Sequence, residues 1–164
     1  MATTTKKTTT PVKKTATAKS SAKKLTAKEV LAMLKSKYDE VYDDGGVYSI
    51  KLNGKWGFAD ANGVVKIKPS FTGIGEEWVE DIITTWGNGG VGFVNKKLEE
   101  ISKPQFSVAG SFKKGVAAVK QKTGKWGFID KKGKTVVPFV FDNIISLSGG
   151  KFQVEVGPFV FITK

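Results

Sequence analysis

The sequence contains no histidine, no cysteine and no arginine. The absence of histidine removes the commonest general base and the commonest metal ligand of proteins. The absence of cysteine excludes a disulfide framework and a thiolate metal site. Neighbouring acidic residues occur, as at Glu80 and Asp81, but neighbours on a strand point to opposite faces and do not converge as catalytic carboxylates do. We therefore expect no enzyme activity, no metal and no cofactor, with a hydrolase that uses Asp, Glu and Lys as the remote alternative.

Long hydrophobic runs are also missing. No apolar run approaches the roughly 20 residues that span a bilayer. The N-terminus is charged and rich in threonine, and no apolar stretch of the kind found in signal peptides follows it. We expect no membrane contact and no secretion by a signal peptide. The expected location is the cytoplasm, in association with the nucleoid, or the inside of a particle such as a virion.

All basic residues are lysines, and they are unevenly distributed along the chain. The formal net charge is +12, and residues 1–28 hold eight lysines and no acidic residue, which gives +8 for this segment alone. Lysine is a compact point charge, whereas arginine forms the bidentate fork that reads guanine edges. The composition therefore favours contact with a polyanion that does not depend on base sequence.

Residues 1–25 are rich in Lys and Thr and nearly lack apolar residues other than Ala. Such a segment cannot bury enough apolar surface to offset its ordering entropy, so we expect a disordered arm. Its composition resembles the Lys/Ala/Thr-rich tails of linker histones and bacterial histone-like proteins. The resemblance implies binding of nucleic acid or another polyanion, and a solvated leader with no specific role is the alternative. The lysines that would make this contact are Lys6, Lys7, Lys13, Lys14, Lys19, Lys23 and Lys24.

Residues 26–44 form a second segment, in which a capped amphipathic helix is expected over 26–42. Thr26 and Glu29 have the spacing of a capping box, and apolar residues then recur at helical spacing until Asp43-Asp44-Gly45-Gly46 ends the pattern. The apolar face has two possible roles: it docks into a groove on another protein, or it caps the β domain of its own chain, as is usual at the ends of repeat proteins. This face consists of Leu31, Leu34, Tyr38 and Val41.

A period of 35 residues dominates the rest of the chain. Residues 124–130 read Gly-Lys-Trp-Gly-Phe-Ile-Asp, residues 54–60 read Gly-Lys-Trp-Gly-Phe-Ala-Asp, and a more divergent copy lies half-way between them. A fixed period in this range is the signature of a repeat architecture. We divide the module at residues 45–164 into units at about 54–88, 89–123 and 124–157, with a partial unit at 158–164.

Each unit predicts three β-strands joined by glycine-containing turns. Aromatic residues that keep their place from unit to unit are expected to fill the core, namely Trp56, Phe58, Phe71, Phe93, Phe106, Trp126, Phe128 and Phe141. The alternative for Trp56 and Trp126 is a platform on which bases or sugars stack. Trp78 and Trp86 lie outside the repeated words, so they are the better candidates for exposed binding aromatics.

These copies resemble the WG repeat family, whose units carry a Gly-Lys-Trp-Gly-Phe-Ile-Asp word, a glycine turn, a proline before an aromatic residue and a Phe/Tyr-Asp pair. The third unit carries the pattern at Trp126, Gly127, Phe128, Ile129, Asp130, Gly133, Pro138, Phe141 and Asp142. The second unit departs from it, because Val91 replaces the tryptophan and Asn95 the aspartate. The resemblance covers about residues 46–164 and implies a β-rich module that serves as an interaction or surface scaffold, without catalytic residues.

The expected fold class is all-β: tandem 35-residue units of three strands in a small closed or nearly closed array, preceded by one short helix and a disordered basic tail. The array begins with a strand at 47–52 and ends with residues 158–163, which align with the Trp-Gly strand. Pairing of these two segments would remove two exposed sheet edges. We therefore expect strand 47–52 to lie near strand 159–163, with an open array as the alternative.

The function that follows is that of a non-catalytic structural or binding protein. Its basic arm would tether the WG-type module to a large polyanionic or protein assembly, and association with nucleic acid without sequence specificity is slightly favoured. The alternative is a structural component of a phage virion or similar particle, in which neighbouring subunits order the arm.

Overall fold

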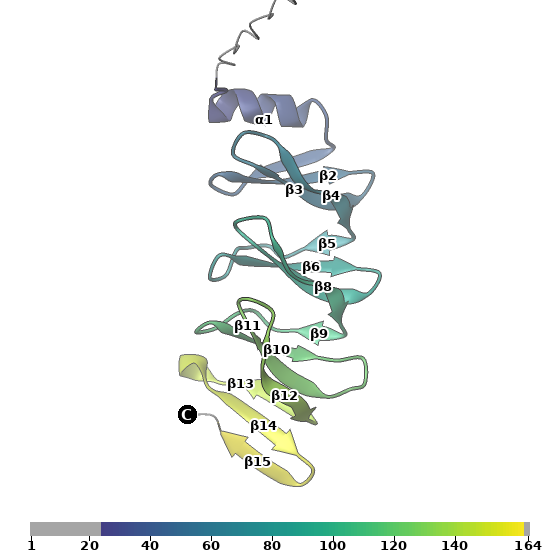
Figure 1. Ribbon diagram of the computed structural model, residues 1–164, viewed down its shortest axis with the longest axis vertical. Coiled ribbons are helices and arrows are strands. Elements are labelled where there is room, and N and C mark those ends of the chain that lie inside the picture. Colours follow the sequence, from purple (N-terminus) through teal and green to yellow (C-terminus); the bar gives the residue numbers. More distant parts are fainter. Residues whose placement is uncertain (1–23, 163–164) are drawn as a thin grey trace, which may run out of the picture.

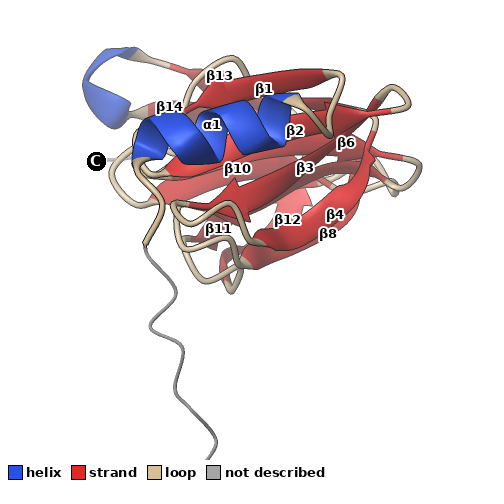
Figure 2. Cartoon of the chain, turned by 90° about the horizontal axis from the view of Figure 1, so that it is seen from above, coloured by secondary structure: helices blue, strands red, loops and turns tan. Residues whose placement is uncertain are grey.

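The computed structural model describes residues 24–162, so all of the expected arm except Lys24 and Leu25 lies outside the described residues. The described part consists of one α-helix followed by four small antiparallel sheets, stacked in chain order (Figure 1). Seen along the stack, the sheets lie over one another beneath the helix (Figure 2). The mostly β fold class with a single short α-helix is thereby confirmed. No helix in residues 24–162 is long and apolar enough to cross a membrane.

The helix α1, Ala27–Lys35, begins at the expected capping box. The backbone nitrogen of Glu29 donates to the hydroxyl of Thr26 at 3.3 Å, and the backbone nitrogen of Thr26 donates to the Glu29 carboxylate at 2.7 Å. These bonds satisfy two of the amide donors that a helix start leaves unpaired. Val30 and Leu34 are buried against the first sheet, so α1 covers one end of the stack.

The helix is shorter than expected, because the prediction of a helix over 26–42 was wrong beyond Lys35. Ser36 forms the C-cap, and the backbone nitrogen of Asp39 donates to the carbonyl oxygen of Lys51 at 2.8 Å. The chain therefore joins the first sheet at this point, and Val41 lies opposite Ile50 on a strand. Pairing with a neighbouring strand has overridden the helical spacing of the apolar residues.

Each of the first three sheets has four strands in chain order, and the fourth has three. The first contains β1 Glu40–Asp43, β2 Val47–Leu52, β3 Lys55–Asp60 and β4 Val65–Phe71. The second contains β5 Gly73–Ile74, β6 Ile82–Gly87, β7 Gly90–Asn95 and β8 Glu100–Phe106. The third contains β9 Val108–Ala109, β10 Val116–Lys120, β11 Trp126–Asp130 and β12 Thr135–Phe141. The fourth contains β13 Asn143–Ser146, β14 Phe152–Val156 and β15 Phe159–Ile162, with a 3₁₀ turn at Ser148–Gly150.

The sheets are offset from the units read in the sequence. The last strand of one sequence unit pairs with the first strand of the next, as β6 pairs with β7 and β10 with β11. A short strand that the sequence did not reveal, β5 or β9, adds a fourth member to the second and third sheets. One 35-residue period therefore corresponds to one layer of the stack, but a layer begins and ends at different residues from a sequence unit.

The expectation of a closed array was wrong. β2 pairs with β1 on one edge and with β3 on the other, so it has no free edge for residues 159–163. β15 pairs with β14 in the fourth sheet, at the end of the stack opposite to α1 (Figure 1). The array is open: α1 covers one end of the stack, and the exposed strand β15 lies at the other end.

The glycine of each Trp-Gly word lies where two backbones approach closely. β3 and β4 pair with a bulge around Phe58. A methyl group on Gly57 would lie 2.5 Å from the carbonyl oxygen of Ile67, and the corresponding distances to the return strand are 2.4 Å for Gly92 and 2.8 Å for Gly127. A side chain at this position would push the return strand away, so the glycine is required by packing between strands.

The aspartate that ends each word closes the following turn. Oδ1 of Asp60 accepts hydrogen bonds from the backbone nitrogens of Asn62 and Val64, at 2.9 and 3.0 Å. Asp130 repeats both bonds in the third sheet, and Asn95 repeats them in the second through its amide oxygen. The replacement of aspartate by asparagine in the second unit therefore preserves the turn, because the turn needs only an acceptor oxygen.

Hydrophobic clusters fill the spaces between successive layers. Of the aromatic residues expected in the core, five are buried, namely Phe58, Phe71, Phe93, Phe106 and Phe128. The other three, Trp56, Trp126 and Phe141, are partly buried and pack against these clusters. Edge-to-face ring pairs with centroids 5.7, 5.1 and 4.9 Å apart join layers or loops at Phe58–Trp78, Phe93–Phe112 and Phe128–Phe152.

Candidate functional site

Three clefts lie between successive sheets of the stack. The first cleft, between the first and second sheets, has a volume of about 340 Å³ and is lined by Tyr42, Asp44, Ser49, Trp56, Ile74, Gly75, Glu76 and Ile83. The second cleft, of about 280 Å³, is lined by Gly75, Glu76, Glu77, Val79, Ile82, Thr84, Trp86, Phe93, Ala109, Ser111 and Phe112. The third cleft, of about 270 Å³, is lined by Val108, Ala109, Gly110, Ser111, Lys113, Ala118, Trp126, Ile144, Ser146 and Phe152.

The three clefts are equivalent by the repeat. Corresponding wall positions, about 35 residues apart, are Ser49, Thr84 and Ala118 on the longer strands. The facing wall is formed by Ile74, Ala109 and Ile144, and the rim by Glu76, Ser111 and Ser146. Stacking of similar layers therefore produces a row of similar clefts. The chemistry of each cleft is set by the residues that differ between units.

The first cleft is aromatic and acidic. The rings of Tyr42 and Trp56 lie with centroids 5.7 Å apart, and the exposed side chain of Glu76 lies in the loop that follows β5 of the second sheet. Asp44 is fixed by the hydroxyl of the buried Ser49, which donates to Oδ2 at 2.7 Å. The recess thus combines a flat apolar surface with two carboxylates at its margin.

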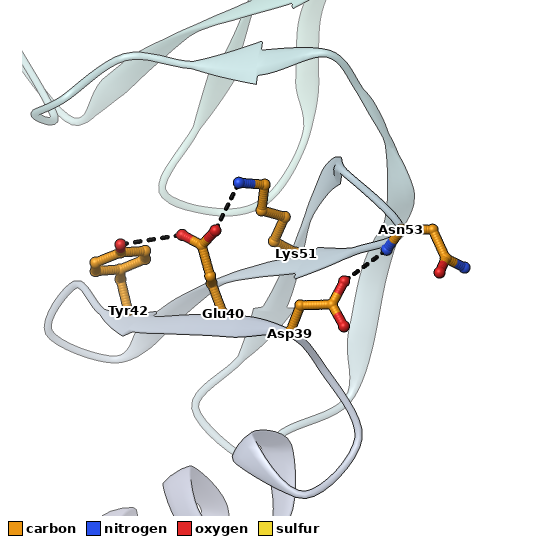
Figure 3. A network of polar contacts seen from close by, with 5 residues as sticks. All are labelled: Asp39, Glu40, Tyr42, Lys51 and Asn53. Atoms are coloured by element: carbon orange, nitrogen blue, oxygen red, sulfur yellow. Dashed lines mark hydrogen bonds and ion pairs between the residues drawn. The ribbon is translucent and has the colours of Figure 1, made fainter.

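A polar network supports the aromatic wall of the first cleft (Figure 3). Lys51 Nζ lies 2.6 Å from Oε1 of Glu40 and 5.0 Å from the ring centroid of Trp56. The Tyr42 hydroxyl donates to Oε2 of Glu40 at 3.1 Å. The hydrogen bond from Lys51 is the main cause that lowers the pKa of Glu40, and Glu40 in turn raises the pKa of Lys51. The network is therefore charged at neutral pH and holds both rings in place.

The second and third clefts differ in charge. In the second, Trp86 is 41% exposed and faces a rim that carries Glu76 and Glu77. In the third, the rim carries Lys113, whose Nζ donates to the Ser146 hydroxyl at 2.8 Å. The row therefore changes from an acidic to a basic rim along the stack.

The tryptophans have different environments. Trp56 and Trp126 each pack on a core cluster and also line a cleft, with a lysine Nζ 5.0 or 5.7 Å from the ring centroid, so core and surface roles coincide in one side chain. Trp86 is exposed, whereas Trp78 is partly buried against Phe58. Trp78 occupies the place that Phe112 fills in the next layer, which is why it belongs to the core. Its indole nitrogen has no hydrogen-bond partner among the described residues.

The apolar face of α1 is occupied by the first sheet. Leu34 is buried, and Leu31, Tyr38 and Val41 pack around the same cluster with Tyr48 and Ile50. Val41 lies on β1 and not on the helix. Within the described residues this face therefore serves the capping role, and it is closed to a partner protein.

The outer surface of the α1 end is basic. Lys24, Lys28, Lys35 and Lys37 are exposed, and residues 1–37 hold ten lysines and one acidic residue. That acidic residue is Glu29, whose pKa is lowered by hydrogen bonds from the backbone and the side chain of Thr26, so its carboxylate is committed to the helix cap. The remaining candidate arm lysines lie outside the described residues.

The clefts were not predicted from the sequence, although the three tryptophans that line them, Trp56, Trp86 and Trp126, were named as candidate binding residues. Their walls include residues from the short strands β5, β9 and β13, such as Ile74 and Ala109. The available signal was the repeat itself, because residues 74, 109 and 144 are spaced at the 35-residue period. Residues 24–162 hold no group of three or more acidic side chains placed to bind a metal ion.

A family model decides the assignment of the second and third units. The model of the WG containing repeat matches residues 92–126 and again residues 126–157. These residues are WG repeats. The resemblance inferred from the Gly-Lys-Trp-Gly-Phe-Ile-Asp words is thereby confirmed for this part of the chain. The first sheet lies outside the matched residues, but its β3–β4 pairing has the same bulged register as the WG repeats.

Among solved structures, the chain is similar to a crystal structure from B. thetaiotaomicron, the extracellular domain of a protein assigned as a hybrid two component system. The identity is 18% and the TM-score is 0.38. The similar region covers 76% of this chain and 20% of that chain, so it spans about one fifth of the solved extracellular chain. No curated protein matches the sequence.

Proposed function

We propose that the protein is a non-catalytic binding protein that associates with nucleic acid or a similar polyanion through residues 1–25 and the outer face of α1. The observation that carries the proposal is the continuity of charge at one end of the stack. Exposed Lys28 and Lys35 stand seven residues apart, hence on the same side of the helix, and Lys24 precedes them. The basic segment therefore leads directly into a basic cap and not into an acidic surface.

The composition of this end favours the phosphate backbone over base edges. Lysine neutralises phosphates as a point charge, and the resulting binding releases counterions and weakens steeply with salt. The chain has no arginine for bidentate reading of guanine. Binding should accordingly be insensitive to base sequence.

The experiment measures binding of the full chain to a fluorescent duplex of mixed sequence. One variant changes Lys6, Lys7, Lys13, Lys14, Lys19, Lys23 and Lys24 to Gln, and a matched control changes seven exposed lysines of the module, Lys68, Lys97, Lys103, Lys122, Lys132, Lys134 and Lys151. The first variant should lose most of its affinity, while the control retains most of it. Equal losses in the two variants would show that only total charge matters and would refute an arm-based contact.

The WG module is proposed to supply contacts with a partner protein through the row of clefts. Recesses with aromatic walls and polar rims are suited to side chains of an extended segment. A photo-crosslinking residue in place of Trp86, in the second cleft, should form covalent products with the partner in cells. The same residue in place of Val64, which is 52% exposed and outside the clefts, should not. Products of similar kind and yield from both positions would argue against the clefts.

A further inference from the structure

β15 carries a phenylalanine where the other sheets require glycine. In the first three sheets the glycine of the Trp-Gly word pairs with a residue of the preceding strand, namely Ile50 of β2, Thr85 of β6 or Val119 of β10. In the fourth sheet the corresponding residue of β14 is Val154, and it pairs with Phe161. Simple alignment of the words would instead put Val160 at this place. By either reading a bulky residue stands at the glycine position.

A bulged return strand cannot pair with β15 in the manner of the other sheets. There the return strand approaches so closely that a methyl group on the glycine would lie 2.4 to 2.8 Å from a carbonyl oxygen. Phe161 carries a Cβ atom where the glycines have none, and an aromatic ring beyond it. The outer edge of β15 is therefore closed to a WG-type return strand, but it remains open to a regular strand without a bulge.

The same strand is exposed and wholly apolar. The exposed fractions of Phe159, Val160, Phe161 and Ile162 are 64, 56, 54 and 63%. Within the described residues β15 pairs only with β14, so its other edge carries unpaired backbone groups. Natural edge strands are usually protected by charges, prolines or bulges, and residues 159–162 contain none of these. An unprotected apolar edge of this kind marks an interaction site.

We propose that β15 is a homodimerisation strand, which pairs antiparallel with β15 of a second copy. A two-fold axis perpendicular to the sheet places either Val160 or Phe161 opposite the same residue of the second copy. In both registers apolar side chains meet apolar side chains on both faces, because faces alternate along each strand. The segment is therefore complementary to itself, which is what an isologous interface requires.

The distribution of charge also selects a second copy as the occupant. The chain carries a net charge of +12, which opposes close approach of two copies. The lysine-rich α1 end and β15 lie at opposite ends of the stack (Figure 1), so pairing through β15 keeps the two basic ends as far apart as the fold allows. The resulting dimer would present a basic cap at each end. This inference does not depend on what the basic cap binds.

Sedimentation velocity of the full chain over a wide concentration range provides the first test. The weight-average mass should rise from 17.7 kDa towards twice that value as concentration increases. Val160→Lys should abolish the rise, because in either register it places a lysine of each copy at or next to the centre of the apolar interface. Val64→Lys, which adds the same charge at a residue of similar exposure, 52% against 56%, should leave it unchanged. A monomer at every concentration, or a dimer that Val160→Lys does not weaken, would overturn the proposal.

A cross-linking experiment keeps the proposal testable if Val160→Lys fails to fold. The natural chain has no cysteine, so a single introduced cysteine can form a disulfide only with a second copy. Val160→Cys or Phe161→Cys should yield a covalent dimer under mild oxidation, several-fold faster than Val64→Cys. The faster of the two cysteine variants at 160 and 161 identifies which residue lies opposite itself in the second copy, and therefore the register of the two strands. Equal rates at all three positions would reflect random collision and would contradict the strand pairing.

Discussion

Glu80 and Lys131 join the second and third layers of the stack: Oε2 of Glu80 lies 2.9 Å from Nζ of Lys131. The same oxygen accepts a hydrogen bond from the backbone nitrogen of Gly115 at 3.0 Å. The loop that follows β5 is thus bound to the neighbouring sheet by one carboxylate. Hydrogen bonding by Lys131 is the main cause that lowers the pKa of Glu80, and burial opposes it.

Replacement of Glu80 by Gln should reduce stability in a pH-dependent manner. A carboxylate with a lowered pKa stabilises the fold above its ordinary pKa of 4.5, and this contribution is lost as the pH falls through the lower value in the folded state. We expect a loss of roughly 0.5 to 1 kcal/mol at about pH 7, because both side chains are partly exposed, and a smaller loss at about pH 3. Urea unfolding of both proteins at the two pH values measures the difference. Glu100→Gln, at an exposed carboxylate, is the control; a loss at Glu80 that does not shrink in acid would contradict the assignment.

The turn after β11 provides a second prediction. Oδ1 of Asp130 accepts from the backbone nitrogens of Lys132 and Lys134 at 2.8 and 2.9 Å. Asp130→Ala should therefore lower the free energy of unfolding by about 1 to 2 kcal/mol. Asp130→Asn should change it by less than about 0.5 kcal/mol, because Asn95 already performs this role in the second sheet. Chemical denaturation decides between them, and equal effects of the two substitutions would show that the turn depends on charge.

Gly57→Ala tests the close approach of the two backbones at the bulge. The added methyl group would lie 2.5 Å from the carbonyl oxygen of Ile67, and displacement of β4 should lower the free energy of unfolding by about 1 to 3 kcal/mol. At Gly110 the nearest atom would be 3.7 Å away, so Gly110→Ala should have little effect. If denaturant midpoints of the two variants coincide, the bulge is not constrained in the way described.

The two tryptophans outside the repeated words should respond differently to truncation. Trp78 packs edge-to-face on the buried Phe58, with ring centroids 5.7 Å apart, so Trp78→Ala should lower the free energy of unfolding by about 3 kcal/mol. Trp86 is 41% exposed in the second cleft, so Trp86→Ala should lower it by about 1 kcal/mol. Thermal unfolding followed by circular dichroism compares the variants. A larger loss for Trp86 would reverse the assignment of core and surface.

Much of the layer could be predicted from sequence because the decisive interactions are local. The Trp-Gly strands, the glycine turns and the capping box at Thr26 depend on residues within a few positions of each other. The period also identified Phe58, Phe93 and Phe128 as equivalent positions, and they are buried in successive layers.

The errors arose where pairing between distant segments decides the outcome. The apolar spacing around Val41 fits a helix, but the available edge of β2 draws this segment into the first sheet. That same pairing occupies the edge that closure with residues 159–163 would have needed. The walls of the clefts were missed for a related reason: β5 and β9 have two residues each and carry no period-two pattern.

The most direct test of the proposed function is the salt dependence of binding to duplex DNA of mixed sequence. The logarithm of the binding constant should fall linearly with the logarithm of salt concentration, with a slope of about −0.9 for each phosphate neutralised. Lys28→Gln combined with Lys35→Gln should reduce the steepness by up to about 2 if both lysines contact phosphates, and two unrelated duplexes should give the same values. Binding that is absent at low salt, insensitive to salt or dependent on sequence would contradict the account.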